Sequence, residues 1–259
     1  MKIKTMMTVA GSDSSGGAGI QADVKTATSL GVFATSAITS ITAQNTMGVN
    51  AVYDLSPEAV ASQIDAIMDD IPPDAVKIGM VSSAEIIKTI ADHLKHYCGP
   101  VVVDPVMVAT SGAPLLREEA EAALKELLLP FATLITPNIP EAEHLLSTKI
   151  TSVEEQVKSA KKMADAYGVS VLVKGGHGTG EAVDIFYDGS VHRFEKPMLD
   201  NPNTHGTGCT LSSAIASHLA LGYSAEEAVK LSKEYVFDAI ADGLNLGHGH
   251  GPIHHMVRR

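Results

Sequence analysis

The stretch "AGSDSSGGAGIQAD", residues 10–23, directly follows a short apolar run at residues 6–9. An apolar strand, a glycine-rich loop and then a helix is the order in which many α/β proteins bind phosphate. The spacing from Gly11 to Gly16 fits the start of the G-x-x-x-x-G-K-[ST] loop, but Gly17 stands in the position of its lysine. The sequence therefore does not predict a P-loop NTPase, and this glycine-rich loop must serve another purpose.

The rest of the chain alternates short β-branched segments with longer segments of helical periodicity, which is typical of a parallel sheet with helices on both faces. Strands are predicted at residues 5–9, 36–42, 75–79, 100–106, 133–136 and 170–175. A hairpin formed by 182–189 and 190–195 should turn at Asp188 and Gly189. Helices are predicted at 56–70, with Ser56 as N-cap, and at 83–97, 117–129, 152–168 and 224–243. We expect an α/β fold with a mostly parallel central sheet in a single domain spanning 1–259.

Composition narrows the function. The formal net charge of −11 argues against nucleic acid as a partner, and 4% aromatic residues leave few platforms for stacking bases. No apolar run reaches the roughly 18–20 residues that span a membrane, and residues 1–13 do not resemble a signal peptide, so we expect a cytoplasmic protein. The two cysteines, Cys98 and Cys209, predict reduced thiols, with Cys98 inert and buried.

Polar or glycine-rich residues follow most of the predicted strands. Asp104 comes at the end of the buried run 101–103, and Lys174 begins a Lys-Gly-Gly turn after another strand. Each turn by itself is ordinary turn chemistry. Because open parallel sheets bind ligands at the carboxyl ends of their strands, their convergence predicts a ligand crevice at that edge.

The stretch "NTHGTGCTLSSAIASHLALG", residues 203–222, predicts an anion site. Gly206, Thr207 and Gly208 precede a helix on which Leu211 and Ile215 share one face. The free N–H groups of the first helical turn bind anionic oxygen, and glycines let the backbone approach closely. Cys209 would lie at this helix N-terminus, where the pKa of a thiol is commonly lowered. The alternative is a glycine-rich turn with a buried cap cysteine.

Residues 136–145, "TPNIPEAEHL", hold two further candidates. Asn138 and Glu141 are three residues apart at a strand-to-helix junction and could orient waters bound to Mg²⁺. The same pair also fits a capping box that only starts a helix.

These motifs resemble the hydroxymethylpyrimidine and phosphomethylpyrimidine kinases of thiamine biosynthesis, a branch of the ribokinase-like small-molecule kinases. The resemblance covers essentially the whole chain: residues 10–23, "SITAQNTMGV" (40–49), "KIGM" (77–80), "DPVM" (104–107), "TPNIPEAE" (136–143), "VKGGH" (173–177), "GTGCTLSSAIAS" (206–217) and "GHGHGPIHH" (247–255). It implies a three-layer α/β/α fold with a small lid, for which 108–116 is the candidate. It also implies a homodimer that uses ATP and Mg²⁺ to phosphorylate 4-amino-5-hydroxymethyl-2-methylpyrimidine and then its monophosphate.

The resemblance gives the first glycine-rich loop to the acceptor substrate. It assigns Gly11, Asp23 and Gln44 to the pyrimidine pocket, with Met80 and Val106 as an apolar floor. It implies that the nucleotide faces Lys174, Gly175 and Gly176, that Mg²⁺ and its waters are managed by Asp104, Asn138 and Glu141, and that the phosphoryl group is held by Gly206, Thr207 and Gly208. Cys209 would act as a base toward the hydroxymethyl group or as its positioner.

Two other functions are compatible with the same fold: a pyridoxal kinase and a ligand sensor. Pyridoxal kinases belong to the same branch, and the resemblance implies that they carry a second cysteine in the lid, where this chain has Thr110. A ligand sensor with a degenerate kinase fold would not need the phosphoryl-transfer groups. The tail at 247–255, with four histidines, predicts a folded C-terminal segment rather than a zinc site.

Overall fold

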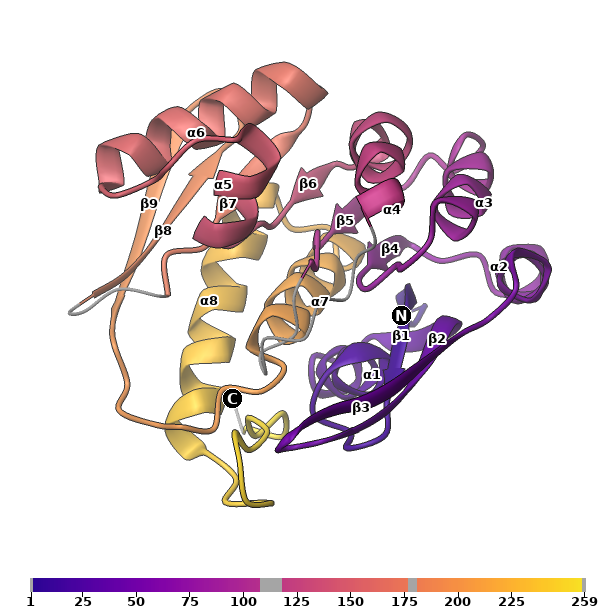
Figure 1. Cartoon of the computed structure of the whole chain (residues 1–259), viewed down its shortest axis with the longest axis horizontal. Helices are drawn as coiled ribbons and strands as arrows, with labels where there is room; N and C mark the ends of the chain where they lie inside the picture. The colour runs from indigo at the N-terminus through magenta and orange to yellow at the C-terminus, as the bar shows by residue number, and fades with distance from the viewer. Residues whose placement is uncertain (1, 108–117, 177–180, 258–259) are drawn as a thin grey trace.

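The computed structural model describes residues 2–107, 118–176 and 181–257. Nine strands of this described part form one sheet in the order β3-β2-β1-β4-β5-β6-β7-β8-β9 (Figure 1). The strands are β1 (Thr5–Asp13), β2 (Phe33–Asn45), β3 (Gly48–Asp54), β4 (Ala75–Ile78), β5 (Val101–Val103), β6 (Leu134–Ile135), β7 (Ser170–Val173), β8 (Glu181–Tyr187) and β9 (Val191–Pro197).

The centre of the sheet is parallel and its two ends are antiparallel. Strands β2, β1, β4, β5, β6 and β7 pair in parallel, whereas β3 pairs antiparallel with β2, and β8 and β9 pair antiparallel at the other end. The predicted α/β class and the hairpin between β8 and β9 are confirmed. The sequence analysis missed β3, whose residues alternate too weakly between apolar and polar to indicate a strand.

Several strands end earlier than predicted. The run 100–106 was expected to continue as a strand, but β5 stops at Val103. Asp104 still donates its N–H to Ile78 O at 2.9 Å, and the next residue is Pro105, which has no N–H to donate. The early end turns the following residues out of the sheet at its carboxyl edge.

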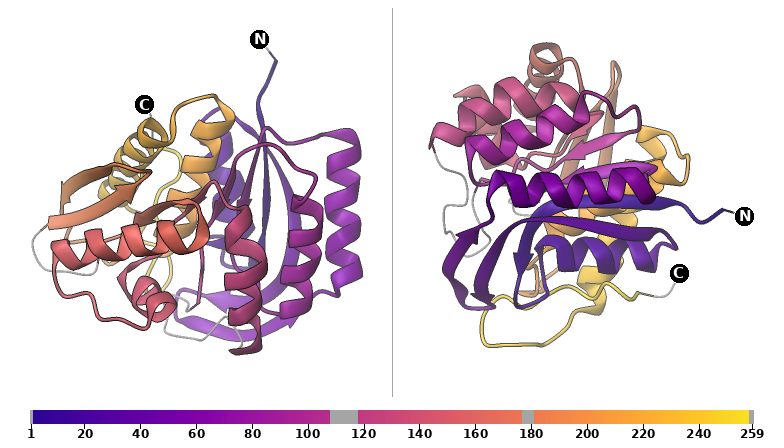
Figure 2. Two further views of the ribbon diagram at one scale, coloured as in Figure 1. Left: turned by 90° about the horizontal axis from the view of Figure 1, so that it is seen from above. Right: turned by 90° about the vertical axis from the view of Figure 1, so that its right-hand side faces the viewer.

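Helices cover both faces of the sheet in two layers (Figure 2). One layer consists of α1 (Gly19–Ser29), α7 (Thr207–Ala220) and α8 (Ala225–Asp242). The other consists of α2 (Pro57–Asp70), α3 (Ala84–Leu94), α4 (Glu118–Ala123), α5 (Ile139–Leu146) and α6 (Val153–Tyr167), with a π-helical turn (Leu124–Leu128) and a 3₁₀ turn (Leu129–Phe131) after α4. The predicted three-layer α/β/α arrangement is confirmed.

The core lies between the sheet and each helix layer. Met6 and Met7 are adjacent in β1 but belong to the apolar clusters on opposite faces, because successive side chains of a strand alternate in direction. Helix α2 begins as predicted, with the Ser56 hydroxyl accepting from Ala59 N and Pro57 in the first turn. Among the described residues, no helix is both long and apolar enough to cross a bilayer.

The C-terminal tail packs onto the body of the protein, as the folded segment predicted for 247–255. Ile253 is fully buried, and Tyr235 donates its hydroxyl to His255 O at 2.6 Å. The backbone N–H groups of His248 and Gly249 both reach Thr46 Oγ1, at 3.1 and 3.2 Å, beside the turn between β2 and β3. The tail therefore runs from the end of α8 to the turn between β2 and β3 (Figure 1).

Candidate active site

A cavity of about 750 Å³ opens at the carboxyl edge of the parallel strands. Residues at or just after the carboxyl ends of the six parallel strands, together with the start of α7, surround it. The predicted site residues among its lining are Gly11, Gln44, Met80, Asp104, Val106, Asn138, Glu141, Lys174, Gly176, Gly206, Thr207, Gly208 and Cys209. The crevice predicted from the strand ends is therefore present, and most of the candidate residues meet in it.

The start of α7 forms one wall. Gly206 is the N-cap, with a φ of 85° that favours glycine, and Thr207 Oγ1 donates to Thr204 O at 2.7 Å. A Cβ on Gly206 would lie 1.8 Å from Gly17 O, so this loop packs directly on the first glycine-rich loop. Gly208 and Cys209 line the cavity in the first turn, where helical N–H groups and the helix dipole favour an anion.

Asp104 and Lys174 form an ion pair beside that helix start. Lys174 Nζ lies 2.9 Å from Asp104 Oδ1, which also accepts from Thr136 Oγ1 at 3.1 Å. Burial by itself raises the pKa of Asp104, but the nearby Lys174 and Lys77 ammonium groups more than offset this and lower it. A Cβ on Gly208 would lie 3.5 Å from both Asp104 Oδ2 and Lys174 Nζ, which shows how near the pair is to the anion wall.

Asn138 and Glu141 form the capping box that was the alternative interpretation of their spacing. Asn138 Oδ1 accepts from Glu141 N at 2.8 Å, and Glu141 Oε2 accepts from Asn138 N at 2.7 Å. Glu141 nevertheless lines the cavity and is buried, and this burial, reinforced by Asp104 and opposed by Lys174, raises its pKa to about 7. The box therefore holds a carboxyl group in the crevice that is costly to ionise.

The donor set at this wall fits a magnesium ion bound mainly through water and phosphate. Asp104 and Glu141 supply carboxylate oxygens, and Lys174 balances only part of their charge. Within the described ranges no group of three or more His, Cys, Asp or Glu side chains is arranged to hold a metal by itself. Mg²⁺ commonly keeps several waters and takes one or two carboxylates together with substrate phosphates, so these residues suit it.

Of the residues predicted for the pyrimidine pocket, Gly11, Gln44, Met80 and Val106 line the cavity, but Asp23 does not. Asp23 has no exposed surface and does not belong to the described cavity lining. Its carboxylate lies 2.8 Å from Lys77 Nζ, accepts from Thr8 Oγ1 at 2.6 Å and also accepts from Ser213 Oγ. The assignment of Asp23 to the pocket is corrected: the residue ties α1 and α7 to the sheet beneath the site.

Cys209 is placed as expected but its chemistry is different. The thiol is at the helix N-terminus and lines the cavity. Burial raises its pKa to about 11; the Lys77 charge opposes this, and the Asp23 and Asp104 charges act in the same direction as burial. The expectation of a lowered pKa is therefore wrong, because desolvation outweighs the Lys77 charge and the hydrogen bond with the Gly19 backbone. Cys98, expected to be buried, is exposed.

Of the three residues predicted to face the nucleotide, two line the cavity and one does not. Lys174 and Gly176 line the cavity, whereas Gly175 packs behind it: its N–H donates to Asp184 Oδ1 at 2.8 Å, and a Cβ there would lie 1.9 Å from Val183 O. The candidate lid at 108–116, with Thr110, lies outside the described residues.

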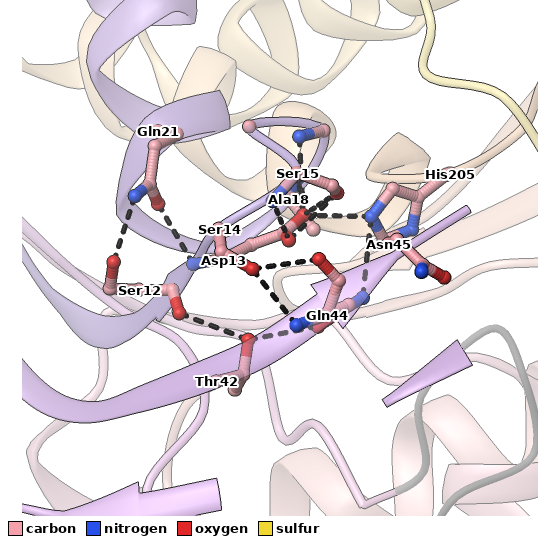
Figure 3. Close-up of polar contacts among 12 residues, drawn as sticks. Ser12, Asp13, Ser14, Ser15, Ala18, Gln21, Thr42, Gln44, Asn45 and His205 are labelled. Carbon is pink, nitrogen blue, oxygen red and sulfur yellow. Dashed lines mark hydrogen bonds and ion pairs between the residues drawn. The ribbon is translucent and has the colours of Figure 1, made fainter. Parts of the chain in front are cut away.

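Sequence reasoning missed a second wall of the cavity. Lys233 Nζ lies 2.6 Å from Asp184 Oδ2, and both residues line the cavity near an apolar surface formed by Met198, Leu199, Val236, Phe237 and Ile240. Val236 and Ile240 share a face of α8 at helical spacing, which signals an apolar face but not that the face borders a cavity. His205 and Asp13 were also missed; they lie 192 positions apart and pair at 2.8 Å (Figure 3).

The fold and this cavity define a ribokinase-like small-molecule kinase. The chain matches the family model described as phosphomethylpyrimidine kinase over residues 13–254, and it belongs to that family. It is 51% identical to the hydroxymethylpyrimidine/phosphomethylpyrimidine kinase of Rhizobium meliloti, over 97% of each chain. It is 50% identical to the thiamine biosynthesis bifunctional protein ThiED of Geobacter sulfurreducens over 98% of this chain, but spans only 52% of that longer protein.

A solved structure of a related kinase has the same fold. The ADP complex of Bacillus subtilis pyridoxal kinase matches with a TM-score of 0.91 and 37% sequence identity, covering 98% of both chains.

Proposed function

We propose that this protein transfers the γ-phosphoryl group of ATP to the hydroxymethyl group of 4-amino-5-hydroxymethyl-2-methylpyrimidine, and then phosphorylates the monophosphate to the diphosphate. One observation carries the proposal: a single cavity joins an apolar and amide-bearing acceptor side to an anion wall and a lysine–carboxylate pair. The name of the Rhizobium meliloti relative supports both acceptors.

Each wall supplies a part of the reaction. Met80 and Val106 would pack against the pyrimidine ring, and the Gln44 amide can donate to and accept from its edge. The turn at Gly206, Thr207 and Gly208 would hold the transferring phosphoryl group through the N–H groups of Gly206 and Gly208, because the Thr207 N–H donates to Thr204 O at 3.2 Å. The apolar wall on α8 would take the adenine, with Lys174 toward the phosphates.

In the transfer step, the hydroxymethyl oxygen forms a bond to the γ-phosphorus while the bond from that phosphorus to its bridging oxygen breaks. ADP leaves, and the hydroxyl proton passes to water. With a pKa of about 11, only about one Cys209 thiol in ten thousand is ionised at pH 7. Cys209 therefore positions the hydroxyl group, which suits a loose transition state that depends little on a base.

Magnesium, when bound, would neutralise the β- and γ-phosphate charges. Asp104 and Glu141 would hold it through its waters, and Asn138 would hold Glu141 in place through the capping box. Lys174 keeps Asp104 ionised and oriented toward the same wall.

The likeness to a pyridoxal kinase structure supports a second candidate substrate, pyridoxal. The absence of a cysteine from the candidate lid segment argues against efficient use of it, because Thr110 cannot form a hemithioacetal with an aldehyde. The first experiment is ADP release from Mg²⁺ and ATP with the hydroxymethylpyrimidine, its monophosphate and pyridoxal in parallel. Turnover of both pyrimidines supports the proposal; turnover of pyridoxal alone refutes it, and no turnover of any acceptor favours a sensor.

We also propose a homodimer, on the strength of an exposed apolar strip on the β2–β3 hairpin. Ile41 and Tyr53 are register partners and are 48% and 63% exposed. β3 is also the edge strand of the sheet. Light scattering on the purified protein tests this: a dimer that the Tyr53→Lys variant dissociates is expected, and a monomeric wild type at micromolar concentration contradicts it.

A further inference from the structure

Asp13 and His205 form a buried hub between the two glycine-containing loops (Figure 3). Asp13 Oδ2 lies 2.8 Å from His205 Nε2 and also accepts from Gly17 N at 3.1 Å and Ala18 N at 2.8 Å. Its other oxygen accepts from Ser15 N at 2.8 Å. Although burial alone raises the pKa of Asp13, these hydrogen bonds lower it far below the ordinary value. Asp13 is therefore a carboxylate, which can only accept hydrogen bonds.

A carboxylate at Oδ2 requires a proton on His205 Nε2. That nitrogen then has no lone pair left to accept a hydrogen bond, whether the ring is neutral or charged. Gln44 Nε2 is placed 3.4 Å from the same nitrogen, and Gln44 Oε1 is placed toward Thr42 (Figure 3). An amide NH₂ at that position would face another N–H, whereas an amide oxygen would share its hydrogen. The two orientations of the amide fill the same space, so the hydrogen bonds decide between them.

Thr42 leads to the same orientation independently. Its hydroxyl lies 3.1 Å from Ser12 O and 3.2 Å from the far side of the Gln44 amide, but it has one hydrogen to donate. Ser12 O is a carbonyl that can only accept, and when the hydroxyl hydrogen points to it at the shorter distance, none is left for Gln44. The Gln44 atom beside Thr42 must then be the donor, that is the NH₂ group, so its oxygen faces His205. In this orientation no two donors face each other, and the one hydrogen on His205 Nε2 is shared between Asp13 Oδ2 and the Gln44 oxygen.

His205 is held from its other side by the tail and the first loop. Its backbone N–H donates to Gly251 O at 3.1 Å, and a Cβ on Gly17 would lie 2.4 Å from His205 Cδ2. This contact gives a reason for the glycine at position 17, where a P-loop has lysine. Any side chain there would collide with the His205 imidazole. Ser14 also holds the Gln44 backbone, with Ser14 Oγ donating to Gln44 O at 2.7 Å.

We propose that His205, oriented by Asp13, is a positioning residue that fixes the Gln44 amide with its oxygen toward His205 and its NH₂ toward Thr42. One N–H and one lone pair of that amide then remain for the acceptor substrate. They select a ring edge that carries an amino donor beside a nitrogen acceptor, and the identity of that substrate as an aminopyrimidine rests on the proposed function. The tail segment 247–255 contributes to this positioning, because Gly251 O accepts the backbone N–H of His205.

A double-mutant cycle tests whether His205 acts through Gln44. His205→Phe keeps a ring but removes the donor, and His205→Gln restores an N–H near Nε2. We expect His205→Phe to raise the KM for the pyrimidine roughly tenfold or more with little change in the KM for ATP, and His205→Gln to recover most of the loss. In a Gln44→Ala background, the effect of His205→Phe should shrink to about twofold or less, because coupled residues are not additive.

The matched control is His144→Phe. His144 Nε2 also pairs with a carboxylate, Glu121 Oε2 at 2.6 Å, but the described cavity lining does not include it. Its kinetic constants should stay at wild-type values. Effects of His205→Phe and Gln44→Ala that simply multiply, or an equal rise in both KM values, would overturn the coupling. His205→Gln gives the same decision if the Phe variant does not fold.

A measurement without substrate separates this inference from the proposed function. In protein labelled with ¹⁵N-histidine, His205 should show a protonated Nε2 that exchanges slowly, assigned by its loss in His205→Gln. A neutral ring with its proton only on Nδ1 would overturn the inference. Failure of the wild type to phosphorylate the pyrimidine would refute only the proposed function, and the state of Nε2 would still decide the role of His205.

Discussion

Replacing Glu141 by Gln should stabilise the protein at pH 8. The ordinary pKa of 4.5 is raised to about 7 in the folded state, chiefly by burial. The folded protein thus binds a proton that the unfolded chain releases between these two values, so the contribution of Glu141 to stability falls as the pH rises from about 4.5 to 7. Above pH 7 the ionised carboxylate costs the fold about 3 kcal/mol.

Gln at the same position removes that cost and keeps the capping box, because Gln also accepts from the N-cap N–H. Urea unfolding followed by circular dichroism should therefore show Glu141→Gln more stable than the wild type by up to about 3 kcal/mol at pH 8 and by less than about 1 kcal/mol at pH 5. Glu155→Gln is the control: Glu155 is also the third residue of its helix but is only half-buried, and hydrogen bonds from Thr151 lower its pKa, so it should gain nothing at pH 8.

The same variant connects stability to activity. The electrostatic cost of Glu141 is useful only if a cation relieves it, so Mg²⁺ with ATP should stabilise the wild type more than Glu141→Gln at pH 8. The kcat/KM for Mg·ATP should fall in the variant, and that of the wild type should rise through pH 7 as Glu141 ionises. A Glu141→Gln variant that is less stable than the wild type at pH 8, or that gains equally at pH 5, would refute the reasoning.

Three further predictions concern the corrected residues. For Cys209, the wild-type kcat/KM for the pyrimidine should not climb tenfold per pH unit between pH 8 and 10, since the thiol acts as a neutral contact; a climb of that size would restore it as the base. Asp23→Asn should cost about 3–5 kcal/mol in urea unfolding by leaving Lys77 unpaired in the core, with an unchanged KM for the acceptor; a raised KM at normal stability would return Asp23 to the pocket. Gly175→Ala should lose about 1–3 kcal/mol because its Cβ meets a carbonyl of β8, whereas Gly176→Ala, with open space around its Cβ, should not; equal thermal stability of the two variants would contradict the packing role of Gly175.

The elements that sequence reasoning found are those whose signals are local. Ser56 and Pro57 mark the start of α2, and Gly206 marks the start of α7, because caps and positive φ depend on residues a few positions apart. The position of the cavity was also predictable, since the carboxyl ends of parallel strands must meet at one edge. Strand β3 was missed because an exposed edge strand buries too little to impose an alternating pattern.

The errors within the site have a different origin. The helical periodicity around Asp23 shows which residues share a face of α1. It does not show that Lys77, 54 positions later, contacts Asp23 in the core. Cys209 was expected to have a lowered pKa from its helix position, which is local, whereas its pKa is set by burial among α7, the sheet and two carboxylates. Gly175 was predicted to face the nucleotide, but it is packed against β8.

The sequence alone determined the fold class, the family and the cavity edge, because periodicity, caps and motifs are written in neighbouring residues. Only the tertiary structure decided which polar groups face the cavity and which lie beneath it, since that depends on contacts between distant segments. His205 and Asp13 show the reason most clearly: nothing near either residue indicates the other, yet their 2.8 Å contact sets the hydrogen bonds of Gln44. Desolvation and hydrogen-bond direction arise only when the chain has folded, and the chemistry of the site depends on both.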